Sequence, residues 1–285
     1  MIDLDKELKS IKLTIQPQVL ASLLNLNETS NTSFSQLDHI VKADQNMSTM
    51  ILKAANSSFY SRGNQVTSLQ HAIAMLGFRV VRSLAMAANS KTLFETGKYS
   101  RFQRYVWKHS TVSGVISREI ASKLKKGDLE EEAFVAGLLH DIGKVILNII
   151  DRKKFIEVLD IIAEKQIPFA EAELTVFGTS HMTVGQKAAG EWKLPENYGK
   201  IFGHHEKFSK ELDSSEDMML VLIVSYGNFL AKKYGYGHYC PQDDADGEYL
   251  EKALGLSDEV KNYFREIYPK KIEEDEFFQF ANRMV

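Results

Sequence analysis

The 285-residue sequence predicts an all-α protein. Prolines are few, only five in the whole chain, and runs that alternate β-branched with polar residues, the mark of strands, are scarce. In addition, many segments repeat apolar residues at helical spacing and carry recognisable helix start and stop signals. These three observations favour a helical bundle over a fold that contains a sheet.

Four helices are predicted in the first hundred residues. The first opens at Ser33, with Gln36 three residues later at the spacing of a capping box. The second covers "NMSTMILKAANSSF", whose apolar residues repeat every three or four positions. The third, "TSLQHAIAMLG", starts with a Thr/Ser cap and stops at a glycine. The fourth, "FRVVRSLAMAANSKTLF", follows directly.

A short polar segment, "TGKYS" at 96–100, is the best boundary between helical blocks, and it is too short to be a flexible linker. A second break, "KKYGYGHYCPQDDADG", precedes two helices near residues 247–254 and 257–267. We therefore expect one contiguous domain in three parts: an N-terminal helical part (1–97), a helical core (98–235) and a C-terminal helical extension (236–285).

Composition restricts the class of protein. A net charge of −3 and an isoelectric point near 6.3 argue against a dedicated nucleic-acid binder or a polybasic membrane module. The single cysteine, Cys240, excludes a disulfide framework and fits a reducing compartment. The first residues, "MIDLDKELKS", are not a signal peptide, and the apolar stretch "MMLVLIV" is too short to span a bilayer. We expect a cytoplasmic protein with neither nucleic-acid nor membrane partners.

The first candidate site residue is His109, in the predicted helix "RYVWKHSTVSGVISREIASKL". Tyr105, His109, Val112, Ile116 and Ile120 fall on one continuous face at helical spacing, so His109 should point where the aliphatic residues point. Both a satisfied core histidine and a metal ligand fit this position.

The second candidate is the pair His140 and Asp141, which follows an apolar run. A helix from Leu129 to about Ile142 is apolar nearly all round, which predicts a buried element, and Gly143 is placed to end it. Burying an unpaired charge costs several kcal/mol or more without a partner or a metal. The pair therefore predicts either a metal site or a polar cap inside the bundle.

Further histidines lie at helix ends. His181 falls in the first turn of a helix capped by Thr179 or Ser180, and shares its inward face with apolar residues. The next helix starts near Pro195 and ends in His204 and His205, of which at least one should face inward, although paired histidines also occur on surfaces. The remaining histidines are interpreted as structural: His39, His71 and His238.

The number and order of these signals point to a metal site. Five of the eight histidines and one aspartate lie at inward or helix-end positions of four consecutive helical segments. Imidazole and carboxylate together suit Fe, Mn, Ni or Zn, whereas Mg and Ca prefer more oxygen ligands. A bundle core built from facing helices is a usual place for such a site. We expect one or two transition-metal ions.

These motifs resemble those of a known superfamily. "HDIGK", "SHMTVG" and "HHE" resemble the HD superfamily of metal-dependent phosphohydrolases, most closely its HD-GYP branch, in which two or three metal ions help to hydrolyse cyclic di-GMP. "IQPQVLASLLNL", "IVKADQNMSTMILKAANSSFY" and "VTSLQHAIAMLGFRVVRSLAM" resemble the HDOD domain, an HD-related output domain of bacterial signalling proteins. The resemblance extends to about residue 235 and implies an HD-type helical bundle with an N-terminal helical subdomain.

The resemblance also implies a set of ligands. Six residues match liganding positions of the HD-GYP pattern: His109, His140, Asp141, His181, His204 and His205. Asn228 stands where the pattern has an aspartate and would be a weak, uncharged ligand. Tyr105 stands where HD-GYP relatives often have a glutamate, and the Gly-Tyr-Pro signature after "HHE" is missing.

Two functions follow from this resemblance. In the first, the chain is a signal-transduction module that binds a metal and acts through a signalling protein partner or a small nucleotide ligand. In the second, it is a metal-dependent phosphodiesterase of the HD-GYP type, in which Asp141 anchors the ions and Lys144 contacts a substrate phosphate. Lys144 can equally be a solvated lysine at a helix end. The Asn228 replacement and the missing Gly-Tyr-Pro favour regulation over catalysis.

Overall fold

The computed structural model describes residues 3–15, 17–26, 31–57, 66–94, 101–206, 216–240, 243–275 and 278–279. These residues form α-helices joined by short turns, with a few π-helical and 3-10 segments near the C-terminus. They contain no strand. The predicted all-α class is confirmed.

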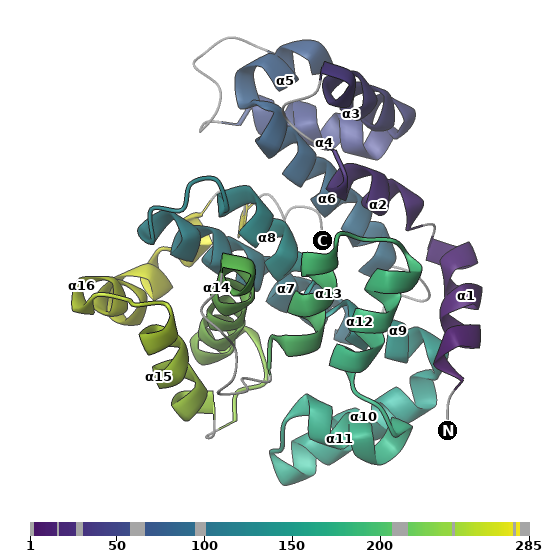
Figure 1. Cartoon of the computed structure of the whole chain (residues 1–285), viewed down its shortest axis with the longest axis vertical. Helices are drawn as coiled ribbons and strands as arrows, with labels where there is room; N and C mark the ends of the chain where they lie inside the picture. The colour runs from purple at the N-terminus through teal and green to yellow at the C-terminus, as the bar shows by residue number, and fades with distance from the viewer. Residues whose placement is uncertain are drawn as a thin grey trace.

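Six helices make up the N-terminal part: α1 (Leu4–Ile15), α2 (Gln18–Leu24), α3 (Asn31–Ala43), α4 (Gln45–Ala55), α5 (Leu69–Leu76) and α6 (Phe78–Phe94). In Figure 1, α3, α4 and α5 gather at one end of the molecule. The long helix α6 runs from this group towards the centre, where it packs on the helices that follow.

The core and the C-terminal region contain ten α-helices: α7 (Arg101–Lys123), α8 (Glu130–Leu139), α9 (Ile142–Ile150), α10 (Arg152–Lys165), α11 (Phe169–Phe177), α12 (His181–Glu191), α13 (Glu196–His204), α14 (Glu216–Ala231), α15 (Asp243–Ala253) and α16 (Asp258–Asn262). A π-helical turn, Lys232–Tyr236, continues α14, and another, Tyr263–Ile267, continues α16. Two 3-10 turns follow, Tyr268–Lys270 and Ile272–Glu274. α7 packs on α8 and α14 in the middle of the molecule, and α10 with α11 forms a hairpin at the end opposite α5 (Figure 1).

The predicted helix caps are largely found. The Ser68 hydroxyl accepts from the His71 N–H at 3.2 Å, and Gly77 ends α5 with φ 83°. The Ser180 hydroxyl likewise accepts from the Thr183 N–H and starts α12. The capping-box start at Ser33 is wrong, because α3 begins at Asn31 and contains this serine. The predicted boundary at 96–100 lies outside the described residues.

Glycines allow the central helices to approach closely. A Cβ on Gly137 of α8 would lie 2.7 Å from the Gly114 Cα of α7. A Cβ on Gly227 of α14 would lie 2.2 Å from the Ser117 hydroxyl of α7. Since real Cβ atoms do not come this near, side chains at these positions would push the three helices apart. The close packing holds α7, which carries His109, against the end of α8.

The helix predicted from Leu129 to about Ile142 is two helices. α8 ends at Leu139, and Asp141 precedes α9, which starts at Ile142. Gly143 therefore lies inside α9 and does not end a helix, which corrects the prediction. A Cβ there would lie 1.9 Å from the His181 carbonyl oxygen, so this glycine permits a close contact between α9 and α12.

The predicted burial of this segment is confirmed, since seven of the eight residues from Ala133 to His140 are apolar or glycine and all eight are buried. By length and composition, the span Glu130–Ile150 could cross a membrane, but 83% of its apolar window is buried inside the protein. That is the pattern of a core helix.

Candidate metal centre

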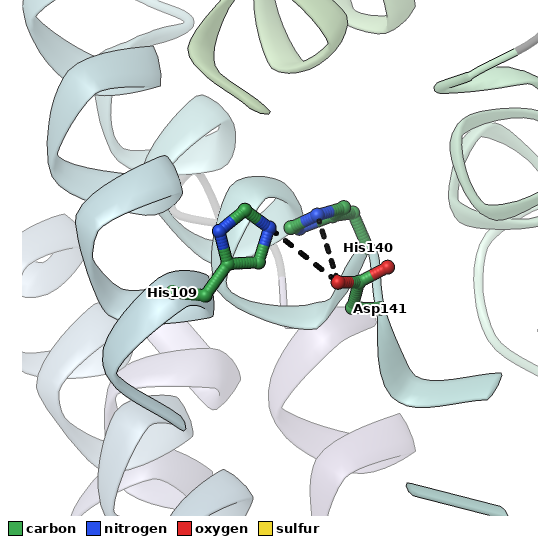
Figure 2. Close-up of side chains that lie close together, drawn as sticks. All are labelled: His109, His140 and Asp141. Carbon is green, nitrogen blue, oxygen red and sulfur yellow. Dashed lines mark ion pairs between the residues drawn. The ribbon is translucent and has the colours of Figure 1, made fainter. Parts of the chain in front are cut away.

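Five of the predicted site residues meet in the interior. His109 comes from α7, His140 and Asp141 from the break between α8 and α9, His181 from the first position of α12, and His205 from the residue after α13. His109 is 3% exposed and the other four are 1% exposed. Figure 2 shows how His109 and His140 both point at the Asp141 carboxylate.

The Asp141 carboxylate is the centre of this group, because each oxygen faces two imidazoles. Its Oδ2 lies 3.4 Å from His109 Nε2 and 3.5 Å from His140 Nε2. Its Oδ1 lies 3.4 Å from His205 Nε2 and 3.6 Å from His181 Nε2. All four histidines thus present the same ring nitrogen, Nε2, to one carboxylate.

The opposite ring nitrogens are anchored elsewhere, which sets the tautomers. His109 Nδ1 lies 3.1 Å from the Tyr236 carbonyl oxygen, and His140 Nδ1 lies 2.6 Å from the Gly137 carbonyl oxygen. A carbonyl can only accept, so each Nδ1 carries the proton and donates it. Nε2 of a neutral ring must then carry a lone pair.

The other two histidines follow the same rule. His205 Nδ1 lies 3.1 Å from the Phe202 carbonyl oxygen and 3.2 Å from that of Ile201. His181 Nδ1 lies 2.6 Å from Oε2 of Glu173, a residue of α11. An imidazole that donates from one nitrogen to a carbonyl or carboxylate is held ready to bind a metal with the other.

Burial keeps three of the imidazoles neutral, and Lys144 keeps the aspartate charged. Burial lowers the pKa of His109 to about 4, and it also lowers the pKa of His140 and of His205. Burial would raise the pKa of Asp141, but the Lys144 ammonium holds it well below its usual range. At neutral pH His109, His140 and His205 are therefore uncharged rings beside a charged carboxylate.

Such a centre consists of acceptors that face each other without protons between them. His109 Nε2, His140 Nε2 and Asp141 Oδ1 are buried and find no hydrogen-bond partner in the described part of the chain. His181 Nε2 and His205 Nε2 lie 3.3 Å apart, and two lone pairs at that distance repel. A cation bound to such atoms would satisfy them, so the residues present fit a metal ion.

The distances agree with this assignment. An ion with bonds of about 2.0–2.2 Å to nitrogen and oxygen keeps neighbouring ligand atoms about 3.0–3.5 Å apart. The three distances among His181 Nε2, His205 Nε2 and Asp141 Oδ1 are 3.3, 3.4 and 3.6 Å. The candidate ligands form two sets, and within each set the ligand atoms lie within 4.8 Å of one another. The first set is His109, His140 and Asp141, and the second is Asp141, His181 and His205.

Lys144 is buried in the centre, at 4% exposure, and is not a solvated helix-end lysine. Its Nζ donates to Asp141 Oδ2 at 2.8 Å and lies 4.0 Å from Glu206 Oε1. It also lies 4.4 Å from the centre of the Phe169 ring, within the range of a cation–π contact. The carboxylates raise the pKa of Lys144 against the effect of burial, so it stays charged.

Sequence reasoning missed three charged residues beside the centre: Glu173, Glu206 and Lys232. Glu206 Oε2 lies 3.7 Å from His181 Nε2, and Lys232 Nζ donates to Glu206 Oε1 at 2.8 Å. Glu206 follows His205 directly in "HHE", so that motif contained a signal for it. Glu173 and Lys232 belong to no motif in the sequence, and only the fold brings them here.

The other predicted site residues lie differently. His204 is partly buried and belongs to neither set of candidate ligands. Asn228 is 2% exposed, and its Oδ1 has no hydrogen-bond partner among the described residues. Tyr105 lines the same small cavity as His109, so it shares that face of α7, but it is 41% exposed and not buried as the aliphatic residues are.

A small cavity adjoins the centre on the side of Lys144 and Lys232. It leaves about 10 Å³ for the centre of a water-sized sphere, which is room for one water. His238, interpreted from the sequence as structural, lies in its wall together with His109 and Asp141. The His238 Nε2 lies 3.1 Å from the Ile167 carbonyl oxygen, so it also ties the wall to the α10–α11 connection.

Comparison with known proteins identifies relatives of this chain. A sequence profile of the HDOD domain matches residues 13–208. An uncharacterised protein of Treponema pallidum (strain Nichols) is 22% identical over 183 residues, which cover 63% of this chain and 35% of that protein. The chain thus spans about a third of the length of that relative.

Two solved structures share the fold over nearly their whole length. An HDOD domain protein of unknown function from Geobacter sulfurreducens has a TM-score of 0.74 at 24% identity, covering 95% of this chain and 99% of that one. A candidate phosphohydrolase from Shewanella amazonensis SB2B has a TM-score of 0.70 at 19% identity, covering 99% and 98%. At these identities the likeness establishes the helical fold.

Proposed function

The chain belongs to the HDOD domain family, and from that premise we propose that it is a bacterial signalling module that binds one transition-metal ion. Asp141 and the four histidines would supply the ligands, in two candidate sets that share Asp141. The module would act in the cytoplasm through a protein partner or a small ligand. The observation that carries the proposal is the convergence of four anchored imidazoles on one carboxylate without a proton between them.

The donor set favours a first-row transition metal. Imidazole nitrogens dominate the centre, and they suit Fe, Mn, Ni or Zn, whereas Mg and Ca prefer sites made of oxygen. The ring nitrogens are already oriented by their Nδ1 hydrogen bonds, so binding needs little rearrangement of the protein.

The charge of the centre supports one ion over two. With neutral imidazoles, the formal charges are those of three carboxylates (Asp141, Glu173 and Glu206) and two ammonium groups (Lys144 and Lys232), a net charge of −1. One divalent ion would bring the centre to +1, and a second would bring it to +3. Asn228, which is uncharged, stands where the HD pattern has another carboxylate.

The cavity supports a regulatory role. A phosphodiesterase must admit a phosphodiester to its metal, yet the cavity beside Asp141 has room for about one water. Lys144 and Lys232 lie on that side and are each paired with a carboxylate at 2.8 Å. A phosphate would have to displace both pairings to reach the centre.

Phosphohydrolysis is the second candidate function, and the position of Lys144 beside Asp141 supports it. A bound ion would polarise a phosphoryl oxygen and lower the pKa of a bound water towards neutrality. Asp141 would anchor the ion, and Lys144 Nζ would leave Asp141 Oδ2 to meet a phosphate oxygen. In that case Asp141→Ala would abolish the hydrolysis of cyclic di-GMP and other phosphodiesters.

Elemental mass spectrometry on protein purified anaerobically and without a histidine tag tests the proposal. We expect one transition-metal ion per chain, and none in a His140→Ala/Asp141→Ala double variant purified in parallel. Two ions per chain, with turnover of a phosphodiester, would replace regulation with hydrolysis. No ion, with none regained on adding Fe, Mn, Ni or Zn, would overturn the metal site.

A further inference from the structure

Glu173 is a fully buried carboxylate that touches one ligand of the centre. It lies on α11, has an exposure of 0%, and accepts twice from His181 through the same oxygen, Oε2. The His181 main-chain N–H donates to Oε2 at 2.7 Å and the His181 Nδ1–H at 2.6 Å. This one oxygen therefore fixes both the start of α12 and the orientation of the ring.

His181 differs from the other three histidines in what holds it. His109, His140 and His205 donate from Nδ1 to main-chain carbonyl oxygens. Only His181 among them depends on a side chain, and that side chain comes from another helix.

Glu173 belongs to the α10–α11 hairpin, which stands at one end of the molecule (Figure 1). The hairpin packs on α9 and α12, the two helices that begin at Ile142 and His181. It reaches the centre through two side chains, Glu173 and Phe169, whose ring lies 4.4 Å from Lys144 Nζ. The contacts that hold the hairpin on the rest of the protein therefore lie beside the candidate metal ligands.

We infer that Glu173 is a positioning residue for His181, and that through it the metal centre and the α10–α11 hairpin stabilise each other. Its carboxylate selects the His181 tautomer that leaves a lone pair on Nε2, 3.6 Å from Asp141 Oδ1. By thermodynamic reciprocity, whatever Glu173 adds to metal affinity, the bound metal adds to the docking of the hairpin. The inference rests on the proposed metal site for its second half, and its first half holds in the metal-free protein.

The first test measures the His181 tautomer by ¹⁵N NMR of the metal-free protein. The wild type should show His181 protonated at Nδ1. Glu173→Ala removes the acceptor and should lose that preference, whereas Glu173→Gln keeps one oxygen acceptor and should retain it. Glu171→Ala, at an exposed position of the same helix, should match the wild type. An unchanged tautomer in Glu173→Ala would overturn the positioning role.

The second test measures metal affinity by calorimetry with Mn²⁺ and Zn²⁺. We expect Glu173→Ala to bind about 10–100-fold more weakly, the usual effect of removing such a partner of a ligating histidine. Glu173→Gln should show a smaller loss and Glu171→Ala none. Equal metal affinity in the wild type and Glu173→Ala would contradict the inference. Failure of the wild type itself to bind would refute the proposed function, while the tautomer still decides the role of Glu173.

The third test needs no variant and covers the case in which Glu173→Ala does not fold. Hydrogen exchange of the wild type is compared with and without metal. Metal should slow exchange in α10 and α11, while α3 to α5, at the far end of the molecule, should not change. Protection that stops at α12 would show that the hairpin is not coupled to the centre.

Discussion

Lys144 is the residue whose charge most directly opposes metal binding. Its ammonium group lies 2.8 Å from Asp141 Oδ2, the oxygen that also faces His109 and His140. A cation bound on that side would lie close to another cation. Oδ1, by contrast, faces His181 and His205 and has no hydrogen-bond partner among the residues that the structure describes. The lysine thus stabilises the metal-free centre and limits how much positive charge it can accept.

Lys144→Met should therefore separate stability from affinity. Breaking a buried ion pair by removing one partner costs about 3–5 kcal/mol, so the metal-free variant should be less stable by that amount in denaturant unfolding. Metal affinity should rise by about tenfold or more, because a nearby positive charge has been removed. The two quantities are measured by urea titration with a chelator and by calorimetry.

Lys187→Met provides the control for this experiment. Lys187 forms a surface pair with Asp5 and its side chain is 49% exposed, so its loss should change stability by about 0–1 kcal/mol and leave metal affinity as it was. If Lys144→Met lowered metal affinity along with stability, Lys144 would stabilise the metal-bound site and would not oppose the binding of the metal ion.

The ligands could be predicted from sequence better than the residues around them. His109, His140 and His181 fall at helical spacings or helix ends that the sequence displays. Glu173 and Lys232 could not be predicted, because their contacts to the site depend on how helices far apart in the sequence pack. The burial of Lys144 could not be predicted for the same reason, because the local pattern does not say whether a lysine at a helix start is buried.

At the level of elements, the break between α8 and α9 creates the centre. His140 and Asp141 lie between two buried helices, so both side chains can turn towards the same point. Periodicity could not predict this break, since apolar residues resume directly after the polar pair and no proline marks it. Gly143 has the residue type of a helix end, but it lies inside α9 and allows α12 to approach closely.

Gly143→Ala should move α9 away from α12. The new Cβ would lie 1.9 Å from the His181 carbonyl oxygen, a backbone atom that cannot rotate away. We expect a loss of about 1–3 kcal/mol in the free energy of unfolding. Metal affinity should fall too, because His181 shifts relative to Asp141.

Gly190→Ala is the matched control on α12. A Cβ there meets nothing within 4 Å, so alanine should stabilise the helix by about 0.5–1 kcal/mol and leave metal binding unchanged. Chemical unfolding and calorimetry on both variants measure these effects. Wild-type stability in Gly143→Ala would show that the two helices can separate at no cost.

At the scale of the whole molecule, part of the C-terminal region helps to enclose the metal centre. Tyr236 supplies the carbonyl that anchors His109, and Lys232 pairs with Glu206. Further along, Arg265 forms two hydrogen bonds with Glu251, at 3.0 and 2.7 Å. The helical class and the succession of core helices followed from sequence patterns, whereas the return of residues 232–240 to the site is a long-range contact that no local pattern contains.

The buried histidines should make the stability of the metal-free protein depend on pH. In the unfolded chain a histidine takes up a proton near pH 6.5, whereas the folded protein holds His109 neutral down to about pH 4. Between these values the unfolded state binds more protons, so stability falls as the pH falls. His109 alone should account for about 3 kcal/mol of this loss.

Urea unfolding at several pH values between 7 and 4, with a chelator present, measures this slope. His109→Gln should reduce it, and His39→Gln, at an exposed position, should leave it unchanged. A free energy of unfolding that stayed constant over this range would mean that the buried histidines take up protons as readily in the folded protein as in the unfolded chain.

The anchoring of three imidazoles by main-chain carbonyls has a consequence for how this site can evolve. No substitution deletes a carbonyl, so drift at most neighbouring positions leaves His109, His140 and His205 oriented. The fourth ring is held by a genetically encoded side chain, Glu173. Within a lineage, position 173 therefore offers selection a way to retune metal affinity in one mutation without changing any ligand.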